Sequence, residues 1–548
     1  METQVNVNAP RKSFKKPLLI IGAAAVVVLG GLGTAYAKLD LFKSAKTIYL
    51  QSEAESMLKF SDNVSKVYGE YEDYMKPYLE KPVHSTTELS DITIDAAVSD
   101  PQAQKVLDLL KNAKLVMQSN IDEQKKQQSG NVEVQLEGKK LATLDYFIND
   151  TVFGFRLPEF YSKYGYFDLK DREALQQKIG QDLPKKFTTY RDMYNAVAFK
   201  QDEVKSVLTP YALIYANSLK DSQVTMKKDV SFSEEGFQSS AREVTVSFSE
   251  EEARSLAKQI AEKAKSDQQL FDLIYTRYHN VASLLADSGY EVNELSKEEF
   301  KKEYDKGLDD MLADLKKEGS NSKEQLKMVM LIDGDHQILS RKLYFTGDQN
   351  NEEQVFWNSV SYEKGADSYY RYSFHDPEDS KRNELTVTYK ASEKSGKTNG
   401  TVTVTAKESD TPMFDLKTTF ETSKEDKKES GKYDFTVLFA DEYEPKPVTF
   451  SGNVTMSETK TDNGIDSEGD VKINFNDPSP DMPKGMSFKV KAKQEFGKPL
   501  EIPAMSADNS INVATVTDEQ MMEVQQEVME SLQKFATEHQ DLVQLFSM

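Results

Sequence analysis

The sequence predicts an α+β protein: an N-terminal transmembrane helix, then two domains of curved antiparallel meander sheets covered by helices. Three observations support this class. Residues 17–37 form an apolar segment without a charge. Short segments that alternate apolar and polar residues fill 86–170 and 325–496, which is typical of strands with one buried face. Stretches with helical periodicity precede, separate and follow these two regions.

The composition limits the possible functions. The chain has 548 residues, a net charge of −22 and no cysteine. An acidic surface repels phosphate backbones, so we expect no nucleic-acid partner. Without cysteine there are no disulfides, thiolate nucleophiles, thiolate metal sites or lipid-modified N-terminal cysteine. The 28 Phe and 26 Tyr residues are enough aromatic material to predict folded domains.

The apolar segment 17–37 predicts how the chain meets a membrane. About 20 helical residues span the roughly 30 Å hydrocarbon core of a bilayer. The basic tail 1–16 precedes the segment, so the positive-inside rule predicts a single-pass cell-membrane protein with an extracytoplasmic bulk. The alternative is a signal peptide cleaved after Ala37, because Ala35-Tyr36-Ala37 fits a cleavage site. Both interpretations export the remaining chain.

We place the first extracytoplasmic α+β domain at 38–220. It opens with a long amphipathic helix at 46–79, whose tyrosine-rich stripe is either a partner-binding face or a surface packed on the sheet. A short helix at 101–112 interrupts the strands that follow. The expected strands are 92–98, 114–121, 131–136, 141–148, 151–157 and 164–169.

The segment 153–169, FGFRLPEFYSKYGYFDL, is dense in aromatic residues. One interpretation is that it lines an apolar cavity, and the other is an ordinary aromatic core and rim. The candidate residues for lining an apolar-ligand site are Phe153, Phe155, Phe160, Tyr161, Tyr164 and Tyr166.

We place the second, β-rich α+β domain at 221–548. After a hairpin, Ser249 with Glu252 forms a capping box that opens a helix. Further helices are expected at about 268–287 and 297–317, and about eleven strands with short connections fill 325–496. Alternation such as that of 401–405, TVTVT, indicates one buried and one wet face. A second capping box, at Thr517 and Gln520, opens a C-terminal helix to about residue 546.

Motifs for catalysis, cofactors or metals are weak. The loosely P-loop-like segment 391–398 lies between two strands instead of leading into a helix, so we interpret it as a hairpin turn. None of the five histidines has a partner at metal-ligand spacing. The oxygen-rich loop 461–470 lacks the spacing of a calcium loop. We therefore assign no catalytic, cofactor-binding or metal residues and expect no enzyme.

The start of the chain, KKPLLIIGAAAVVVLGG…AKLDLFKSAKTIYLQSEAES, resembles a family of membrane-anchored extracytoplasmic proteins of Bacillus-like bacteria. The segment LDYFINDTVFGFRLPEFYSKYGYFDL is similar to a sequence pattern that recurs in other extracytoplasmic bacterial proteins. In architecture the chain resembles the lipoprotein-carrier class, in which a curved antiparallel sheet wraps helices around an apolar groove. The resemblance implies a Gram-positive envelope protein and carries over no catalytic residues. The missing cysteine departs from lipidated carriers.

Two functional hypotheses follow. The first is a non-enzymatic, membrane-anchored envelope protein that holds or senses an apolar ligand, such as a lipid, in a groove between sheet and helices. The alternative is a structural or interaction module for cell-wall or protein partners. The sequence identifies neither the ligand or envelope partner nor the oligomeric state.

Overall fold

The computed structural model describes most of the chain after residue 42. The described ranges are 43–96, 101–198, 201–316, 325–346, 353–376, 383–408, 411–440, 447–475 and 483–540. The predicted membrane segment at 17–37 therefore lies outside the described residues. Among those that are described, no helix combines the length and apolarity needed to cross a bilayer.

The described strands form one sheet of twenty strands. The N-terminal strands are β1 (Val83–Asp95), β2 (Ala113–Asp122), β3 (Gln127–Leu136), β4 (Lys139–Ile148), β5 (Val152–Leu157) and β6 (Tyr161–Asp168). A hairpin of β7 (Val224–Glu234) and β8 (Phe237–Ser249) follows. A long meander comes next. It consists of β9 (Gln325–Ile332), β10 (Ile338–Thr346), β11 (Glu353–Lys364), β12 (Asp367–His375), β13 (Asn383–Lys394), β14 (Lys397–Glu408), β15 (Thr411–Glu425), β16 (Lys428–Phe439), β17 (Val448–Lys460), β18 (Gly464–Phe475) and β19 (Gly485–Phe496). The last strand is the short β20 (Ser510–Asn512).

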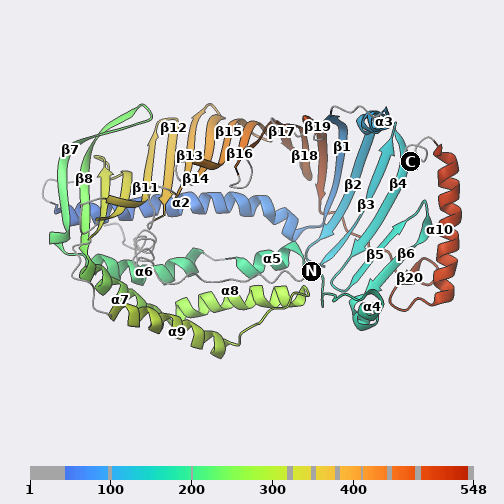
Figure 1. Ribbon diagram of the computed structural model, residues 1–548, viewed down its shortest axis with the longest axis horizontal. Helices are drawn as coiled ribbons and strands as arrows, with labels where there is room; N and C mark the ends of the chain where they lie inside the picture. The colour runs from blue at the N-terminus through green and yellow to red at the C-terminus, as the bar shows by residue number, and fades with distance from the viewer. Residues whose placement is uncertain are drawn as a thin grey trace.

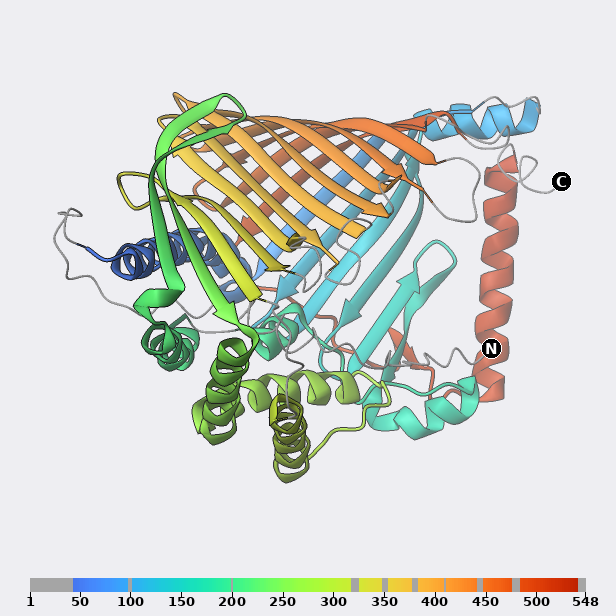
Figure 2. The ribbon, with the colours of Figure 1, turned by 60° about the vertical axis from the view of Figure 1, so that its left-hand side comes forward.

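The strand order departs from chain order at two places, where β1 joins β19 and where β20 joins β6. Strands β7 to β19 lie side by side in sequence order, each antiparallel to the next. Strand β1 then pairs with β19 on one side and β2 on the other, and β2 to β6 continue the sheet. The short β20 adds to β6 in parallel. Figures 1 and 2 show the resulting arch, with the β7–β8 hairpin curled over one end.

This sheet corrects the predicted fold class. We expected two separate meander sheets, and the pairing of β1 with β19 joins the N-terminal and C-terminal strands into a single one. The strands themselves were predicted well, since eleven strands, β9 to β19, occupy residues 325–496. The transmembrane helix of the predicted class is not among the described helices. The predicted domain boundary at residue 220 falls between a helix and β7, and the division into two domains stays a prediction.

The helices lie mainly on one side of the arch. They are α2 (Ala45–Glu80), α3 (Pro101–Lys111), α4 (Arg172–Ile179), α5 (Tyr190–Val197), α6 (Gln201–Ser218), α7 (Glu250–Ser266), α8 (Gln268–Asp287), α9 (Lys297–Lys316) and α10 (Asp518–Glu538). In Figure 1, α2 runs beneath the arch and α5 to α9 form a layer further below. Helix α10 stands at the far end, beside β6 and β20.

Local sequence explains where these helices begin. The Ser249 and Thr517 side chains accept hydrogen bonds from the backbone N–H groups of Glu252 and Gln520, which confirms both predicted capping boxes. Such a cap satisfies backbone donors that the first helical turn leaves free. The predicted helix 46–79 is confirmed as α2, whose 36 residues extend for about 54 Å.

The main core holds the helices against the β7–β11 end of the sheet. Tyr49 of α2 and Tyr215 of α6 are buried, and their hydroxyls hydrogen-bond at 2.7 Å. Burial is the largest cause that raises the pKa of both tyrosines, so both hydroxyls are neutral at pH 7. Ala257 of α7 and Met330 of β9 complete this core. It fixes α2 at one end of the arch, which positions the surface described next.

Candidate functional site

The two faces of the sheet can be told apart by their contacts with α2. Arg341 of β10 donates hydrogen bonds from Nε and Nη2 to the Glu53 carboxylate of α2, at 3.3 and 2.5 Å. At the other end of α2, Tyr78 donates a hydrogen bond to Gln494 of β19, and its ring packs 5.1 Å from that of Phe496. We call the face that carries these three strand residues the inner face, and the opposite one the outer face.

The register then assigns every neighbouring residue to a face, because directly paired residues of antiparallel strands project to the same side. Arg341 pairs with Ser359, which pairs with Tyr372. From Tyr372 the same row crosses one residue per strand from β13 to β18. Its members are Val387, Val404, Leu416, Val437, Phe450 and Phe475.

The outer face of the same strands is polar. The row that starts at Arg371 continues through Thr388, Thr403, Lys417 and Thr436. The TVTVT alternation of 401–405 places both valines on the inner face and the threonines on the outer one, but all five residues are half-buried, so the predicted contrast of a buried and a wet face is not seen there. An apolar face and a polar face alternate at period two along each strand because successive side chains point to opposite sides.

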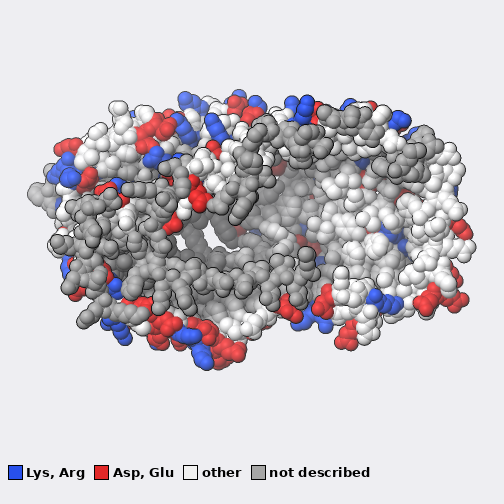
Figure 3. All heavy atoms as spheres, viewed as in Figure 1, with Lys and Arg blue, Asp and Glu red and all other residues white. Residues whose placement is uncertain are grey.

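Among the described residues, part of the inner face is exposed. Nine large apolar side chains on strands are 37 to 55% exposed and all lie on it, whereas Leu157 sits at an irregularity of the β5–β6 pairing. The nine are Val134, Leu144, Phe155, Tyr372, Phe374, Leu385, Phe439, Val448 and Met456. Figure 3 shows a hollow in the middle of the molecule and, to its right, a concave surface of mostly uncharged residues. Exposed apolar patches of this extent mark binding surfaces.

Glycine–aromatic pairs make the inner face flatter; we call the apolar part of this face the wall. Gly400 of β14 pairs with Phe420 of β15, and a Cβ on this glycine would meet the phenylalanine ring at 2.3 Å. Tyr146 lies in the same way over its partner Gly130. The ring of each pair therefore lies along the sheet over the glycine instead of standing up from it. Such pairs are a known device for sheets that curve.

Few polar atoms interrupt the inner face. Burial raises the pKa of Tyr372, and of Tyr389 on the neighbouring strand, so their hydroxyls stay neutral at pH 7. Trp357, the single tryptophan of the chain, pairs with Phe374. Its indole N–H is buried, and no acceptor in the described part of the chain reaches it. A buried donor left in this state costs about 1 to 3 kcal/mol.

Charged side chains reach the inner face of the meander at its margin. Lys424 of β15 pairs in register with Glu429 of β16, and their side chains form an ion pair at 3.0 Å. Lys460 of β17 approaches the same carboxylate at 3.6 Å. The hydrogen bond and the charge of Lys424 lower the pKa of Glu429. A chain bound on the inner face between β13 and β18 would thus meet ionic groups at this edge, and the Arg341–Glu53 pair lies further along the same face, on β10.

The structure separates the six residues predicted to line an apolar site. Phe153 and Phe155 lie on the inner face, in the rows that contain Phe496 and Gln494 respectively. Phe153 packs against Phe167 and, at 6.4 Å, against Phe187. Their role as ligand-lining residues stays a prediction.

The other four residues lie elsewhere. Tyr166 pairs with Gly154 on the outer face, and the Tyr164 ring packs 5.5 Å from that of Phe147. Phe160 packs 5.2 Å from Phe535 of α10. Burial, followed by two carboxylates of α10, raises the pKa of Tyr161. Aromatic density alone groups all six residues, whereas the alternation of side chains along a strand separates inner from outer positions.

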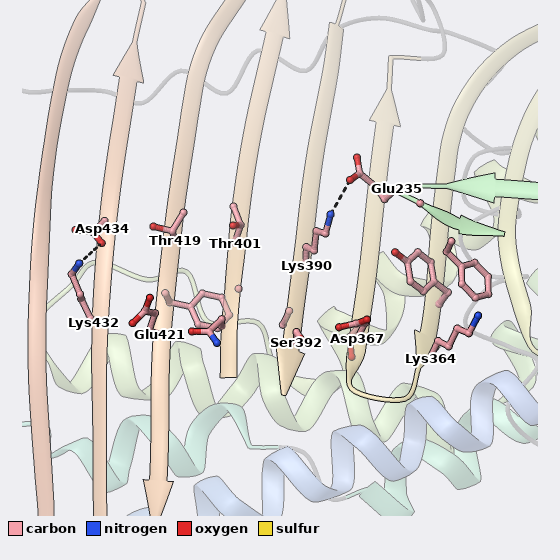
Figure 4. Close-up of a pocket in the computed structure, with 18 residues that line it drawn as sticks. Glu235, Lys364, Asp367, Lys390, Ser392, Thr401, Thr419, Glu421, Lys432 and Asp434 are labelled. Carbon is pink, nitrogen blue, oxygen red and sulfur yellow. Dashed lines mark hydrogen bonds and ion pairs between the residues drawn. The ribbon is translucent and has the colours of Figure 1, made fainter. Parts of the chain in front are cut away.

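A second hollow lies on the outer face, under the tip of the β7–β8 hairpin. This cavity of about 740 Å³ is lined by residues of the tip and of β11 to β16. Figure 4 shows Lys390 reaching Glu235 of the tip, at 3.0 Å, and Lys432 beside Asp434. The hydrogen bond to Glu235 raises the pKa of Lys390. Both signs of charge line this cavity, so it offers no apolar surface comparable to the inner face.

The described residues offer little for metal or nucleophilic chemistry. No group of three or more His, Asp or Glu side chains among them could hold a metal ion. The segment 391–398 is the β13–β14 hairpin, with Ser395 and Gly396 at positive φ, which confirms its interpretation as a turn. His336 is buried in a tight turn, 3.3 Å from Ser52 Oγ.

No family model matches the chain, and no curated protein resembles it in sequence. The similar solved structures include a loop-deletion mutant of OmpT, an outer membrane protein of Vibrio cholerae, at 7% identity and a TM-score of 0.20 over 76% of this chain and 98% of that one. OccAB4 of Acinetobacter baumannii has 7% identity and a TM-score of 0.23 over 76% and 98%. The CymD monoaromatic hydrocarbon channel has 8% identity and a TM-score of 0.20 over 86% and 96%. TM-scores this low carry no argument about fold or function.

The predicted single-pass localisation in the cell membrane has to be corrected. Within the described residues no membrane-spanning helix is found, and the segment 17–37 lies outside them. The β-sheet character of the chain is confirmed.

Proposed function

We propose that this chain is a non-enzymatic envelope protein whose inner face binds the hydrocarbon chains of a lipid. The observation that carries the proposal is the continuous apolar wall on the inner face, which keeps large side chains such as Phe439 and Val448 about half exposed. Leaving such side chains in water does not stabilise the fold, because full burial of one large apolar side chain contributes about 1.5 to 3 kcal/mol to stability. A bound hydrocarbon chain would remove this surface from water.

The chemistry of the wall favours hydrocarbon over a protein segment. The row from Val387 to Phe475 carries only aliphatic and aromatic side chains, and each of its strands, β13 to β18, pairs with a neighbour on both sides. A peptide would bring backbone N–H and C=O groups that find no partners on such a wall, and each buried unpaired group costs about 1 to 3 kcal/mol. Acyl chains carry no such groups.

Quenching of tryptophan fluorescence tests the proposal directly. Trp357 is the single tryptophan and is paired with the half-exposed Phe374 on the inner face. Vesicles of phosphatidylcholine brominated on its acyl chains should quench its emission, because bromine quenches only at short range. Unbrominated vesicles are the control. Unchanged emission, together with no lipid extracted from the purified protein, would leave the interaction module as the better hypothesis.

Two neighbouring substitutions on β14 separate the two faces. Val404→Glu places a charge on the inner face between Val387 and Leu416, whereas Thr403→Glu places it on the outer face. A carboxylate in contact with hydrocarbon costs several kcal/mol, so Val404→Glu should weaken lipid binding by at least about tenfold. Thr403→Glu should bind as the unchanged protein does. Equal effects of the two substitutions would contradict a site on the inner face.

A further inference from the structure

The apolar wall continues across the pairing of β19 with β1, which we call the seam. At this seam Val490 of β19 pairs with Leu89 of β1, which pairs with Leu115 of β2, which pairs with Val134 of β3. The next row carries Met117, Val132 and Leu144. The N-terminal and C-terminal strands therefore contribute to one uninterrupted apolar surface.

The length of this surface exceeds that of one lipid. It extends from β12 through β19 and on from β1 to β6, which is fourteen neighbouring strands. At about 4.8 Å between strands it measures about 60 Å along the sheet. The acyl chains of one lipid occupy half of a hydrocarbon core of about 30 Å, or about 15 Å. One lipid thus covers about a quarter of the wall.

The wall also lacks an internal boundary that would confine a ligand to one position. Between β13 and β19, the inner-face rows that begin at Leu385, Val387 and Tyr389 contain no charged side chain in the described residues. The seam rows that begin at Val490 and Ala492 are also uncharged from β19 to β4. Towards the meander the Val490 row continues uncharged through Gly469, Met456 and Gly431, whereas the Ala492 row meets Glu458 and Glu429. A ligand chain therefore finds uncharged surroundings at each step on the side of the Val490 row.

From this length and uniformity, and resting on the function proposed above, we infer that the inner face is a conduit. It holds several lipids in file and lets them move along the sheet across the β19–β1 seam. A carrier for a single lipid would need only a short part of this surface, and the rest would stay exposed to water without use.

Stoichiometry tests the conduit independently of the proposed function. The full chain is incubated with vesicles of dioleoyl phosphatidylcholine, re-isolated and examined by native mass spectrometry. Two or more lipids bound to each chain are expected. One lipid per chain would overturn the conduit and leave the proposed function standing, whereas no bound lipid would overturn both.

The position of bound lipid can be read at two distant points, because the chain has no cysteine to interfere. Single cysteines replace Leu416 on β15 or Leu144 on β4, which lie eight strands and about 38 Å apart along the sheet. Each carries a polarity-sensitive fluorophore. Lipid should shift the emission at both positions at saturation, and a shift at one position alone would overturn the conduit.

A barrier at the seam tests movement. Leu89→Glu introduces a charge into the middle of the wall, and Thr86→Glu, on the exposed outer side of the same strand, is the matched control. Transfer of fluorescent phosphatidylcholine between donor and acceptor vesicles should slow at least tenfold in Leu89→Glu and stay unchanged in Thr86→Glu. Circular dichroism checks that each variant is folded. Unchanged transfer by a folded Leu89→Glu variant would overturn the conduit.

Discussion

The ion pair that fixes α2 to the sheet gives the sharpest stability prediction. The side chains of Arg341 and Glu53 are only 16 and 4% exposed, and the guanidinium also donates to Ser56 Oγ at 3.3 Å. Removing one partner of a buried pair leaves an uncompensated charge and costs about 3 to 5 kcal/mol. Glu53→Leu and Arg341→Met should each lower the free energy of unfolding by about this amount, and the double variant should recover most of it.

Urea unfolding followed by circular dichroism measures these values, and the midpoint should fall while the slope stays constant. The adjacent residue supplies a matched control, because Lys342 forms an ion pair with Glu353 in which the side chains are 40 and 45% exposed. Lys342→Met should cost less than about 1 kcal/mol, as exposed pairs do. If Glu53→Leu costs no more than Lys342→Met, the assignment of a stabilising buried pair is wrong.

Three further predictions concern stability. Gly154→Ala should destabilise the protein by about 1 to 3 kcal/mol in urea unfolding, because the new Cβ would lie 2.1 Å from the Phe147 ring. Gly69→Ala, in the middle of α2 with nothing within 4 Å, should instead stabilise by about 0.5 to 1 kcal/mol, and a loss there would contradict the open surroundings. Burial opposes ionisation of Asp267, but hydrogen bonds from Lys263 and other donors outweigh it and lower the pKa below 3.8. Its stabilisation is therefore complete above the ordinary pKa and lost as the pH falls through the lowered one, so the stability deficit of Asp267→Asn should shrink below pH 3.8 in acid titrations.

Local structure could be predicted from local sequence. The capping residues Ser249 and Thr517 begin their helices as expected, and alternation located the eleven strands of the meander. These features depend on neighbouring residues, whose hydrogen bonds and side-chain directions follow from a few positions of the chain. The two faces of the sheet follow from the same alternation.

The joining of the two halves could not be predicted in this way. Strand β1, VHSTTELSDITID, is largely polar, and nothing in its sequence identifies β19 as its neighbour. For the same reason, the face of the sheet on which each candidate site residue lies could not be predicted. Phe153 and Phe155 belong to the inner face because of pairings that lead through β1 to β19, and Tyr166 belongs to the other face because of its pairing with Gly154. Only the register assigns these residues to a side.

The place of β1 between β2 and β19 also constrains how the protein is made. Roughly 400 residues separate the two paired strands, and at about 5 to 20 residues per second their synthesis takes roughly 20 to 80 seconds. Throughout that time one edge of β1, a strand of thirteen residues, lacks the partner that β19 later provides. Its polar composition and the kink at Asp91, where φ is 52°, make that edge a poor template for unrelated strands.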